Sequence, residues 1–151
     1  TLGDPMQKAT FGTRAMAWFG DLLVMAVLAS IITFIFGSAI GLTAGRENAF
    51  LGFLSGTLAM IMFALLFLLQ FIYFGYFWSK DGQSIGMRWL HIRVVRQGSE
   101  DLSFWRAAFR GSLGYWISGV VFYLGYLWAL WDKDAETWHD KIFDTWVVQA
   151  E

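Results

Sequence analysis

The chain has 151 residues, of which 57% are hydrophobic and only 15% charged, and its formal net charge is −1. A soluble domain of this length needs a larger charged surface, so the composition excludes an ordinary soluble protein. The sequence contains no cysteine, which excludes disulfides, thiolate metal sites and cysteine catalysis. We therefore expect one domain, residues 1–151, that is integral to a membrane.

Two long apolar runs predict two transmembrane helices, the first over about residues 13–40 and the second over about residues 50–78. Roughly 20 helical residues cross the hydrocarbon core of a bilayer, and both runs exceed that length. Arg14 stands at the start of the first run, and Asp21 is the only other charged residue in either. A carboxylate at this depth is costly unless it is paired or faces protein or water, so Asp21 is the first candidate functional residue.

Small residues recur every four positions towards the end of the first helix and form one face: Ala29, Thr33, Gly37, Gly41 and Gly45. Such a face allows two membrane helices to approach closely; the alternative is that the glycines only loosen the helix end. In the second helix we expect Gln70 to hydrogen-bond across helices. The aromatic residues 71–78 at its end are typical of a membrane–water interface.

Residues 79–103 form a loop whose basic side chains predict the topology. The positive-inside rule places this loop in the cytoplasm, where we expect contacts with anionic lipid headgroups from Lys80, Arg88, Arg93 and Arg96. The N-terminus then lies on the cytoplasmic side, and the polar turn at residues 45–48 lies outside. Within the loop, the alternation over Leu90–Val95 predicts a short strand.

A third apolar segment over about residues 104–131, with Ser103 as its helix cap, precedes a polar tail at residues 132–151. A full span would export the tail. A re-entrant or interface-lying segment would return it to the cytoplasm, where Thr145–Val148 can pair with Leu90–Val95. Isolated strands leave backbone groups unsatisfied, which favours the second arrangement. The predicted fold is an all-α membrane protein with two transmembrane helices, a third membrane-embedded segment and a small two-stranded element.

Three pieces of the chain, residues 14–21, 82–95 and 138–148, resemble the RDD family of small membrane proteins, which is named for one arginine and two aspartates. Residues 85–87 are Ile-Gly-Met where that family has Pro-Gly-Lys. The resemblance implies a family-motif charge network made of Arg14, Asp21, Arg110, His139 and Asp140. Some members of the family are linked to cation/proton antiport and others to the assembly of larger membrane complexes.

The spacing of Arg14 and Asp21 puts them on one helix face, about 10 Å apart along the axis. This is too far for a direct salt bridge unless the arginine bends, so a third group such as Asp140 is the more natural partner for Arg14. The network either locks the tail, the loop and the first helix together, or it leaves Asp21 to bind and release a proton or Na⁺.

The leading functional prediction is a non-catalytic accessory subunit that packs against a larger membrane protein complex; the alternative is cation/proton antiport that uses Asp21. We expect no enzyme activity, no catalytic residues, no cofactor, no metal site and no nucleic-acid partner. The expected partners are membrane lipids and either other membrane subunits or further copies of the chain. We place the protein in the cytoplasmic membrane of a prokaryote.

Overall fold

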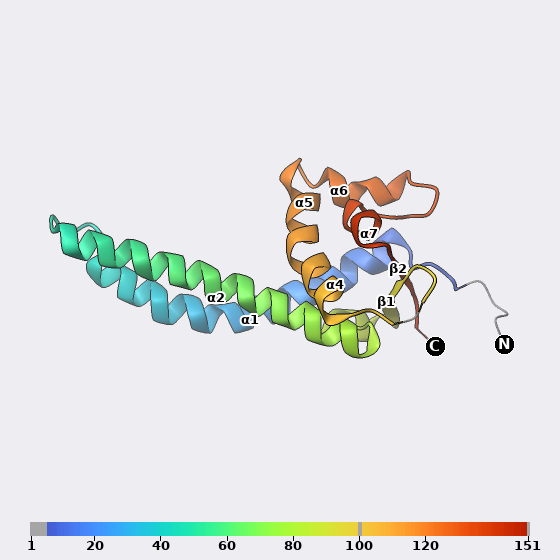
Figure 1. The fold of residues 1–151 in the computed structure, drawn as a ribbon, viewed down its shortest axis with the longest axis horizontal. Helices are drawn as coiled ribbons and strands as arrows, with labels where there is room; N and C mark the ends of the chain where they lie inside the picture. Colours follow the sequence, from blue (N-terminus) through green and yellow to red (C-terminus); the bar gives the residue numbers. More distant parts are fainter. Residues whose placement is uncertain (1–5, 100, 151) are drawn as a thin grey trace.

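The computed structural model describes residues 6–99 and 101–150, and two long apolar helices dominate it (Figure 1). Helix α1 (Phe11–Thr43) and helix α2 (Ala49–Asp81) have 33 residues each and form an antiparallel hairpin. At 1.5 Å per residue each is about 50 Å long, well beyond the ~30 Å of a bilayer's hydrocarbon core. Both are long and apolar enough to cross a membrane, as the sequence predicts.

Polar residues at the helix ends explain where the helices start and stop. The hydroxyl of Thr10 accepts a hydrogen bond from the backbone of the first turn of α1, and the side chain of Asn48 does the same for α2. The hairpin turn contains Gly45 with φ +73°, and α2 ends at Gly82 with φ +74°, conformations that favour glycine. The turn predicted at residues 45–48 is therefore present.

The loop after α2 contains a short helix that the sequence did not predict. Helix α3 (Ile85–Trp89) comes first, and strand β1 (Ile92–Arg96) starts two residues later than the predicted Leu90–Val95. His91 lies in the turn between them with φ +50°. Five residues are too few to show a helical period, and contacts with α1 described below hold α3 in place.

The third apolar segment is not a continuous helix. After Ser103, which caps α4 as predicted, the chain bends by 101° beyond Val120 and then turns back. The bend contains Phe122 and Tyr123 with φ +46° and +59°. The segment consists of α4 (Phe104–Phe109), the π-helical turn η1 (Arg110–Gly114), α5 (Tyr115–Val120), α6 (Leu124–Leu127) and the 3₁₀ turn η2 (Trp128–Leu130).

The tail returns to the loop and pairs with it, which confirms the predicted two-stranded element. Helix α7 (Trp138–Phe143) leads into strand β2 (Thr145–Gln149), which runs antiparallel to β1 with Val94 opposite Val147. The N-terminal lead-in joins the same sheet, because the backbone N–H of Ala9 donates to the carbonyl of Val147 over 2.9 Å. The lead-in, the loop and the tail therefore lie at one end of the molecule.

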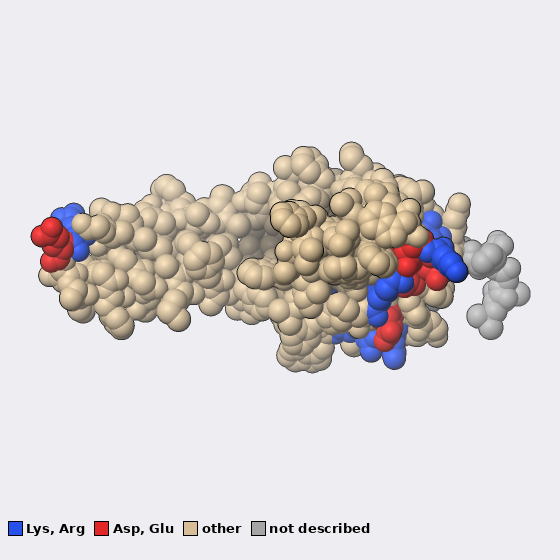
Figure 2. Space-filling model, turned by 90° about the horizontal axis from the view of Figure 1, so that it is seen from above, with Lys and Arg blue, Asp and Glu red and all other residues tan. Residues whose placement is uncertain are grey.

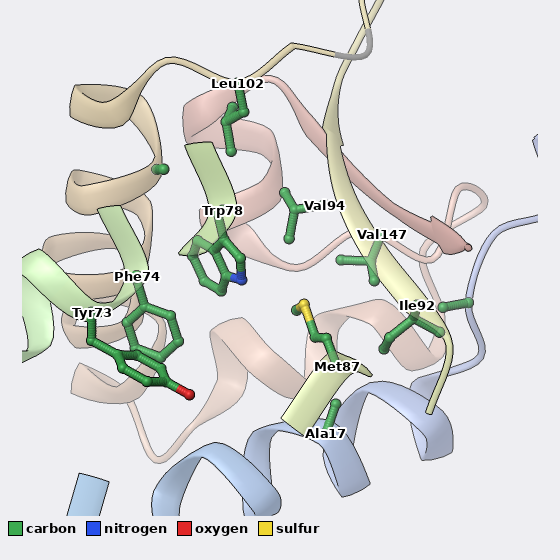
Figure 3. Close-up of a cluster of buried hydrophobic side chains, with 11 residues drawn as sticks. Ala17, Tyr73, Phe74, Trp78, Met87, Ile92, Val94, Leu102 and Val147 are labelled. Atoms are coloured by element: carbon green, nitrogen blue, oxygen red, sulfur yellow. The ribbon is translucent and has the colours of Figure 1, made fainter. Parts of the chain in front are cut away.

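We call this end, residues 6–22 and 73–150 as far as they are described, the head, and residues 23–72 the shaft. The core of the head lies where α2, α3 and the sheet meet, and it includes Phe74, Trp78, Met87, Val94 and Val147 (Figure 3). Trp78 and Val94 are almost completely buried. This apolar core fixes the side chains that build the polar sites of the head.

Charged side chains lie at the head and at the hairpin tip, and the rest of the shaft shows none (Figure 2). In the most apolar 18-residue stretch of α1 none of the residues is buried by the rest of the chain, although those that face α2, such as Ile32 and Phe36, are half-buried; in that of α2, 17% of the residues are buried. The shaft consequently presents most of its apolar residues to whatever surrounds it in the membrane.

Candidate functional site

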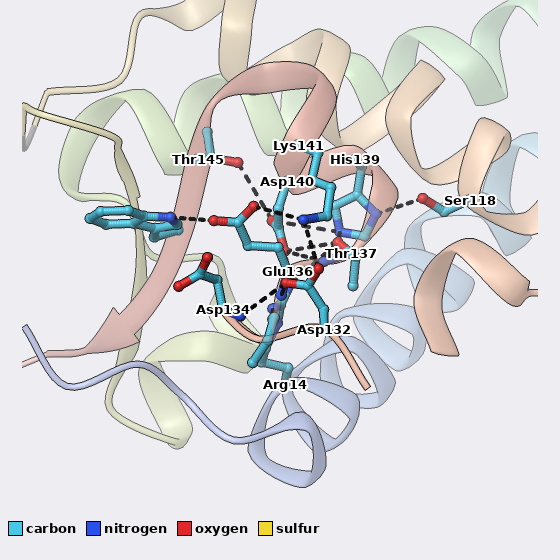
Figure 4. Close-up of polar contacts among 12 residues, drawn as sticks. Arg14, Ser118, Asp132, Asp134, Glu136, Thr137, His139, Asp140, Lys141 and Thr145 are labelled. Atoms are coloured by element: carbon cyan, nitrogen blue, oxygen red, sulfur yellow. Dashed lines mark hydrogen bonds and ion pairs between the residues drawn. The ribbon is translucent and has the colours of Figure 1, made fainter. Parts of the chain in front are cut away.

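Asp140 is the centre of the main polar cluster, and its carboxylate is completely buried (Figure 4). One carboxylate oxygen accepts from the Nη2 group of Arg14 on α1, and the other accepts from the Nη2 group of Arg110 on η1. The backbone N–H of Thr137 donates to Asp140 over 3.0 Å and its hydroxyl over 2.8 Å. Asp140 therefore joins the tail to both α1 and the third segment.

Both arginines make further contacts that fix their direction. The Nη1 group of Arg14 donates to the carbonyl of Ala135 over 2.7 Å. The Nε group of Arg110 donates to the hydroxyl of Thr145 over 2.9 Å, and its guanidinium lies 4.6 Å from the centre of the Trp78 ring. Arg110 opens a π-helical turn, a distortion that often occurs at functional sites.

The charges of this cluster hold Asp140 ionised. Burial by itself raises the pKa of the Asp140 carboxyl, but the guanidinium groups of Arg14 and Arg110 hold that pKa well below its ordinary value. Two guanidinium groups against one carboxylate leave the cluster with one net positive charge if His139 is neutral.

His139 extends the cluster and is buried in neutral form. Burial lowers the pKa of His139 well below its ordinary value. Its Nε2 lies 2.9 Å from the hydroxyl of Thr137, and its Nδ1 lies 2.8 Å from that of Ser118 on α5. Because the Thr137 hydroxyl donates to Asp140, it accepts from Nε2–H, so Nδ1 accepts from Ser118. This chain of hydrogen bonds connects α5 to the carboxylate.

Asp21 forms a separate cluster. Its carboxylate accepts hydrogen bonds from the hydroxyl of Tyr73 over 2.8 Å, the hydroxyl of Ser84 over 2.5 Å and the backbone N–H of Gly86 over 2.8 Å. Within the described residues no cationic side chain pairs with it. The predicted five-residue network is therefore split: Arg14, Arg110, His139 and Asp140 contact one another, whereas Asp21 bonds to α2 and α3.

Helix α3 packs directly against α1 beside Asp21. A Cβ atom added to Gly86 would lie 2.1 Å from the carbonyl oxygen of Ala17, so only glycine permits this approach. The Asp21 carboxylate thus accepts a hydrogen bond from the backbone N–H of Gly86 in the first turn of α3, and this hydrogen bond holds the loop against the first helix.

Sequence reasoning missed the hydroxyl groups that complete both clusters: Tyr73, Ser84, Ser118, Thr137 and Thr145. One of them carries a recognisable signal, since a threonine three residues before an acidic residue at a helix start is a capping box. The contact between Ser118 and His139 joins residues 21 positions apart and has no such signal.

Two cavities lie beside these clusters. The smaller, of about 220 Å³, is lined by Arg14 and Arg110, and the larger, of about 460 Å³, is lined by Asp21 and Gln70. The amide of Gln70 donates to the carbonyl of Gly111 over 2.7 Å, which confirms that it hydrogen-bonds across helices.

The small-residue face on α1 does not form the contact between the two long helices. Gly37 and Gly41 have open space where a Cβ would stand, Thr33 and Gly45 are exposed, and Ala29 is half-buried. The hairpin is instead joined near its tip by a hydrogen bond of 2.7 Å between the hydroxyls of Ser55 and Thr43. The face remains open.

The four predicted lipid-contacting residues lie around α2, α3 and β1, and their role stays a prediction. Arg88 pairs with Asp81 over 2.7 Å near the surface, and Lys80 lies over the ring of Tyr76. Arg96 is exposed and Arg93 is half-buried.

Comparisons with known proteins give one family. The family model described as RDD family matches residues 8–144, which include both polar clusters except Thr145. No curated protein and no solved structure matches the chain.

Proposed function

The chain belongs to the RDD family, and we propose that it acts as a non-catalytic accessory subunit that packs laterally against a larger membrane protein complex. The observation that carries this proposal is the uncovered shaft. Apart from residues next to the head, such as Gln70 and Phe71, which contact the third segment, its helices contact only each other, so their remaining surface is free for lipid or for the helices of a partner.

The open small-residue face makes a helix partner a good match for this surface. Membrane helices associate mainly by close van der Waals packing, which small residues allow because the backbones approach. Gly37 and Gly41 supply such a site on α1 and large exposed side chains such as Phe34 flank it. A partner helix could lie in this depression with its own side chains against the two glycines.

The head supports the same role by its rigidity. The Asp140 cluster and the Asp21 cluster together bind the loop, the tail and the third segment to the first turns of α1. The Ser118 hydroxyl donates to His139, but it is completely buried, so a substrate has no access to it in this conformation. A fixed head is suited to holding neighbouring subunits in place.

Affinity purification from the native membrane in mild detergent tests the proposal. The tagged wild-type chain should co-purify with membrane subunits at a fixed ratio, and Gly37→Leu should lose them because the new side chain fills the open face. Ile31→Leu, at an exposed position on the same helix, is the matched control and should retain them. A monomer without subunits, or equal recovery with Gly37→Leu, would contradict the proposal.

Cation/proton exchange is the second candidate, and the environment of Asp21 favours it. This carboxylate lines the 460 Å³ cavity and accepts three hydrogen bonds with no cationic partner within the described part of the chain. A proton or Na⁺ would complete its charge balance. Nevertheless, the shaft has no charged side chain other than Arg46 and Glu47 at the hairpin tip. One copy of the chain therefore offers no polar path across the membrane, and an oligomer would have to supply one.

Proteoliposomes that contain a pH-sensitive dye separate the two candidates. Exchange requires that an imposed Na⁺ gradient moves protons and that Asp21→Asn abolishes this movement. Asp81→Asn, which changes an exposed carboxylate at the end of α2, is the control and should leave it unchanged. The accessory role predicts no proton movement in any of the three proteins, and unchanged flux in Asp21→Asn would remove this residue from an exchange mechanism.

A further inference from the structure

The smaller cavity of the head has a positively charged end and an aromatic body. Arg14 and Arg110 contribute the charge, whereas Trp18, Tyr115 and Tyr126 contribute rings. Ligand sites in proteins commonly combine a mainly apolar lining with a few charged groups that orient the ligand. At about 220 Å³ this cavity is larger than the engineered 150 Å³ cavity that holds benzene.

One of the residues that line this cavity, Arg110, carries a donor with no acceptor. The Nη1 group of Arg110 is buried and has no hydrogen-bond partner among the residues that the structure describes, although Nε and Nη2 of the same guanidinium are both bonded. An unsatisfied buried donor is costly, and more so when it is charged. The cluster also keeps one net positive charge. Both features call for an acceptor that carries a single negative charge.

The two cavities adjoin along a shared wall. Four aromatic residues line both of them: Trp18, Tyr115, Tyr123 and Tyr126. The larger cavity continues from this wall along apolar side chains of α1 and α5, among them Leu22, Met25 and Val120. Leu22 is an exposed apolar residue on a membrane helix, so this end of the path leads towards lipid.

From this arrangement we infer that the head binds a single-chain anionic amphiphile, with its carboxylate at Arg110 and its hydrocarbon chain running past the shared aromatic wall into the larger cavity. A fatty acid is the simplest molecule of this class. The inference does not depend on the proposed accessory role, because it concerns the head and not the shaft.

The geometry favours a carboxylate over a phosphate group. One free guanidinium nitrogen of Arg110 offers donors to one or two oxygens. Both Nη groups of Arg14 and the Nε and Nη2 groups of Arg110 already donate to Asp140, Thr137, Ala135 and Thr145. A carboxylate needs few donors and carries one charge, which the cluster neutralises. A phosphate group has more oxygens to satisfy and a bulkier head.

Native mass spectrometry of the purified full chain in detergent tests this inference, with oleate, methyl oleate and oleoyl lysophosphatidylglycerol as probes. Oleate should give one saturable adduct per chain. The methyl ester should bind at least about tenfold more weakly, because it lacks the charge that makes a hydrogen bond to a guanidinium group strong, and 1.4 kcal/mol corresponds to tenfold in affinity. Equal binding of acid and ester, or no saturable oleate adduct, overturns the inference.

A cavity-filling variant locates the site. Ala15 lines the smaller cavity and is otherwise exposed, so Ala15→Phe should block the cavity without disturbing the fold and should abolish the oleate adduct. Met16→Phe adds bulk at the next, exposed position outside the cavity and should bind oleate normally. Ala15→Leu, a smaller change, should weaken binding by an intermediate factor. Unchanged oleate binding in both Ala15 variants would overturn the assignment, and stronger binding of the lysophospholipid than of oleate would overturn the preference for a carboxylate.

Discussion

Replacing Asp140 by alanine should destabilise the head more than any change to a surface charge. The substitution removes the only carboxylate between the guanidinium groups of Arg14 and Arg110. It also removes the acceptor for the backbone N–H and the hydroxyl of Thr137, so the start of α7 loses its cap. Two like charges would then remain together in a buried site.

The magnitude follows from the burial of the pair. Removing one partner of a buried ion pair costs about 3–5 kcal/mol, because the other partner stays as an uncompensated charge. Asp134 is the matched control, since it pairs with Lys8 over 3.0 Å but its side chain is 65% exposed. A surface pair of this kind contributes about 0–1 kcal/mol, so Asp134→Ala should have little effect.

Thermal unfolding in detergent, followed by the fluorescence of the nine tryptophans, measures both variants. For a chain of this size about 1 kcal/mol shifts Tm by roughly 2–4 °C, so Asp140→Ala should lower Tm by about 6–20 °C. Asp134→Ala should lower it by no more than about 4 °C. Equal shifts for the two variants would refute the conclusion that the buried cluster locks the head.

Three further outcomes are expected. Burial lowers the pKa of His139 well below that of the unfolded chain, so protons bind preferentially to the unfolded state. Stability should therefore fall as the pH drops below ~6.5, with a slope that approaches about 1.4 kcal/mol per pH unit, and a His139→Gln variant measured by the same unfolding assay should lose this dependence. Gly86→Ala places a Cβ against the carbonyl of Ala17 and should lower the free energy of unfolding by about 1–3 kcal/mol or more. Gly37→Ala places its Cβ in open space and should be neutral or slightly stabilising, and denaturation in mixed detergent compares the two variants. Single cysteines introduced at the exposed positions Gln149 and Glu47 should be labelled by an impermeant maleimide from opposite faces of the membrane, with Gln149 accessible from the cytoplasm; labelling of both from one face would contradict this topology.

The sequence predicts an element well where a single physical requirement, such as the thickness of the bilayer or the pairing of backbone groups, decides its structure. The first two apolar runs are well beyond the length that a bilayer requires, so both long helices were predicted, whereas the shorter third run left two arrangements open. The pairing of β1 with β2 was predictable from the backbone groups that two isolated strands leave unsatisfied. The contacts of Asp140 with Arg14 and Arg110 followed from the family motif and from the cost of unpaired charge near the membrane.

The features that sequence reasoning missed depend on contacts between distant residues. Helix α3 has five residues and no helical period, and it is held by Asp21, which lies 65 positions before Gly86. The sequence allowed a re-entrant third segment but did not place its sharp bend, where Phe122 and Tyr123 take left-handed conformations between Gly119 and Gly125. Local preference opposes such conformations, and tertiary packing of the third segment must compensate for them.

Both polar clusters are attached to helix α1. The Asp140 cluster holds the tail and the third segment to α1 at Arg14, and the Asp21 cluster holds the loop to α1 two turns later. Helix α1 then continues without a break to Thr43, through the open face at Gly37. A partner on the shaft and a ligand in the head would therefore contact the same rigid helix. Any coupling between them requires α1 to shift as a unit, because α1 contains no interruption in which a local change could be absorbed.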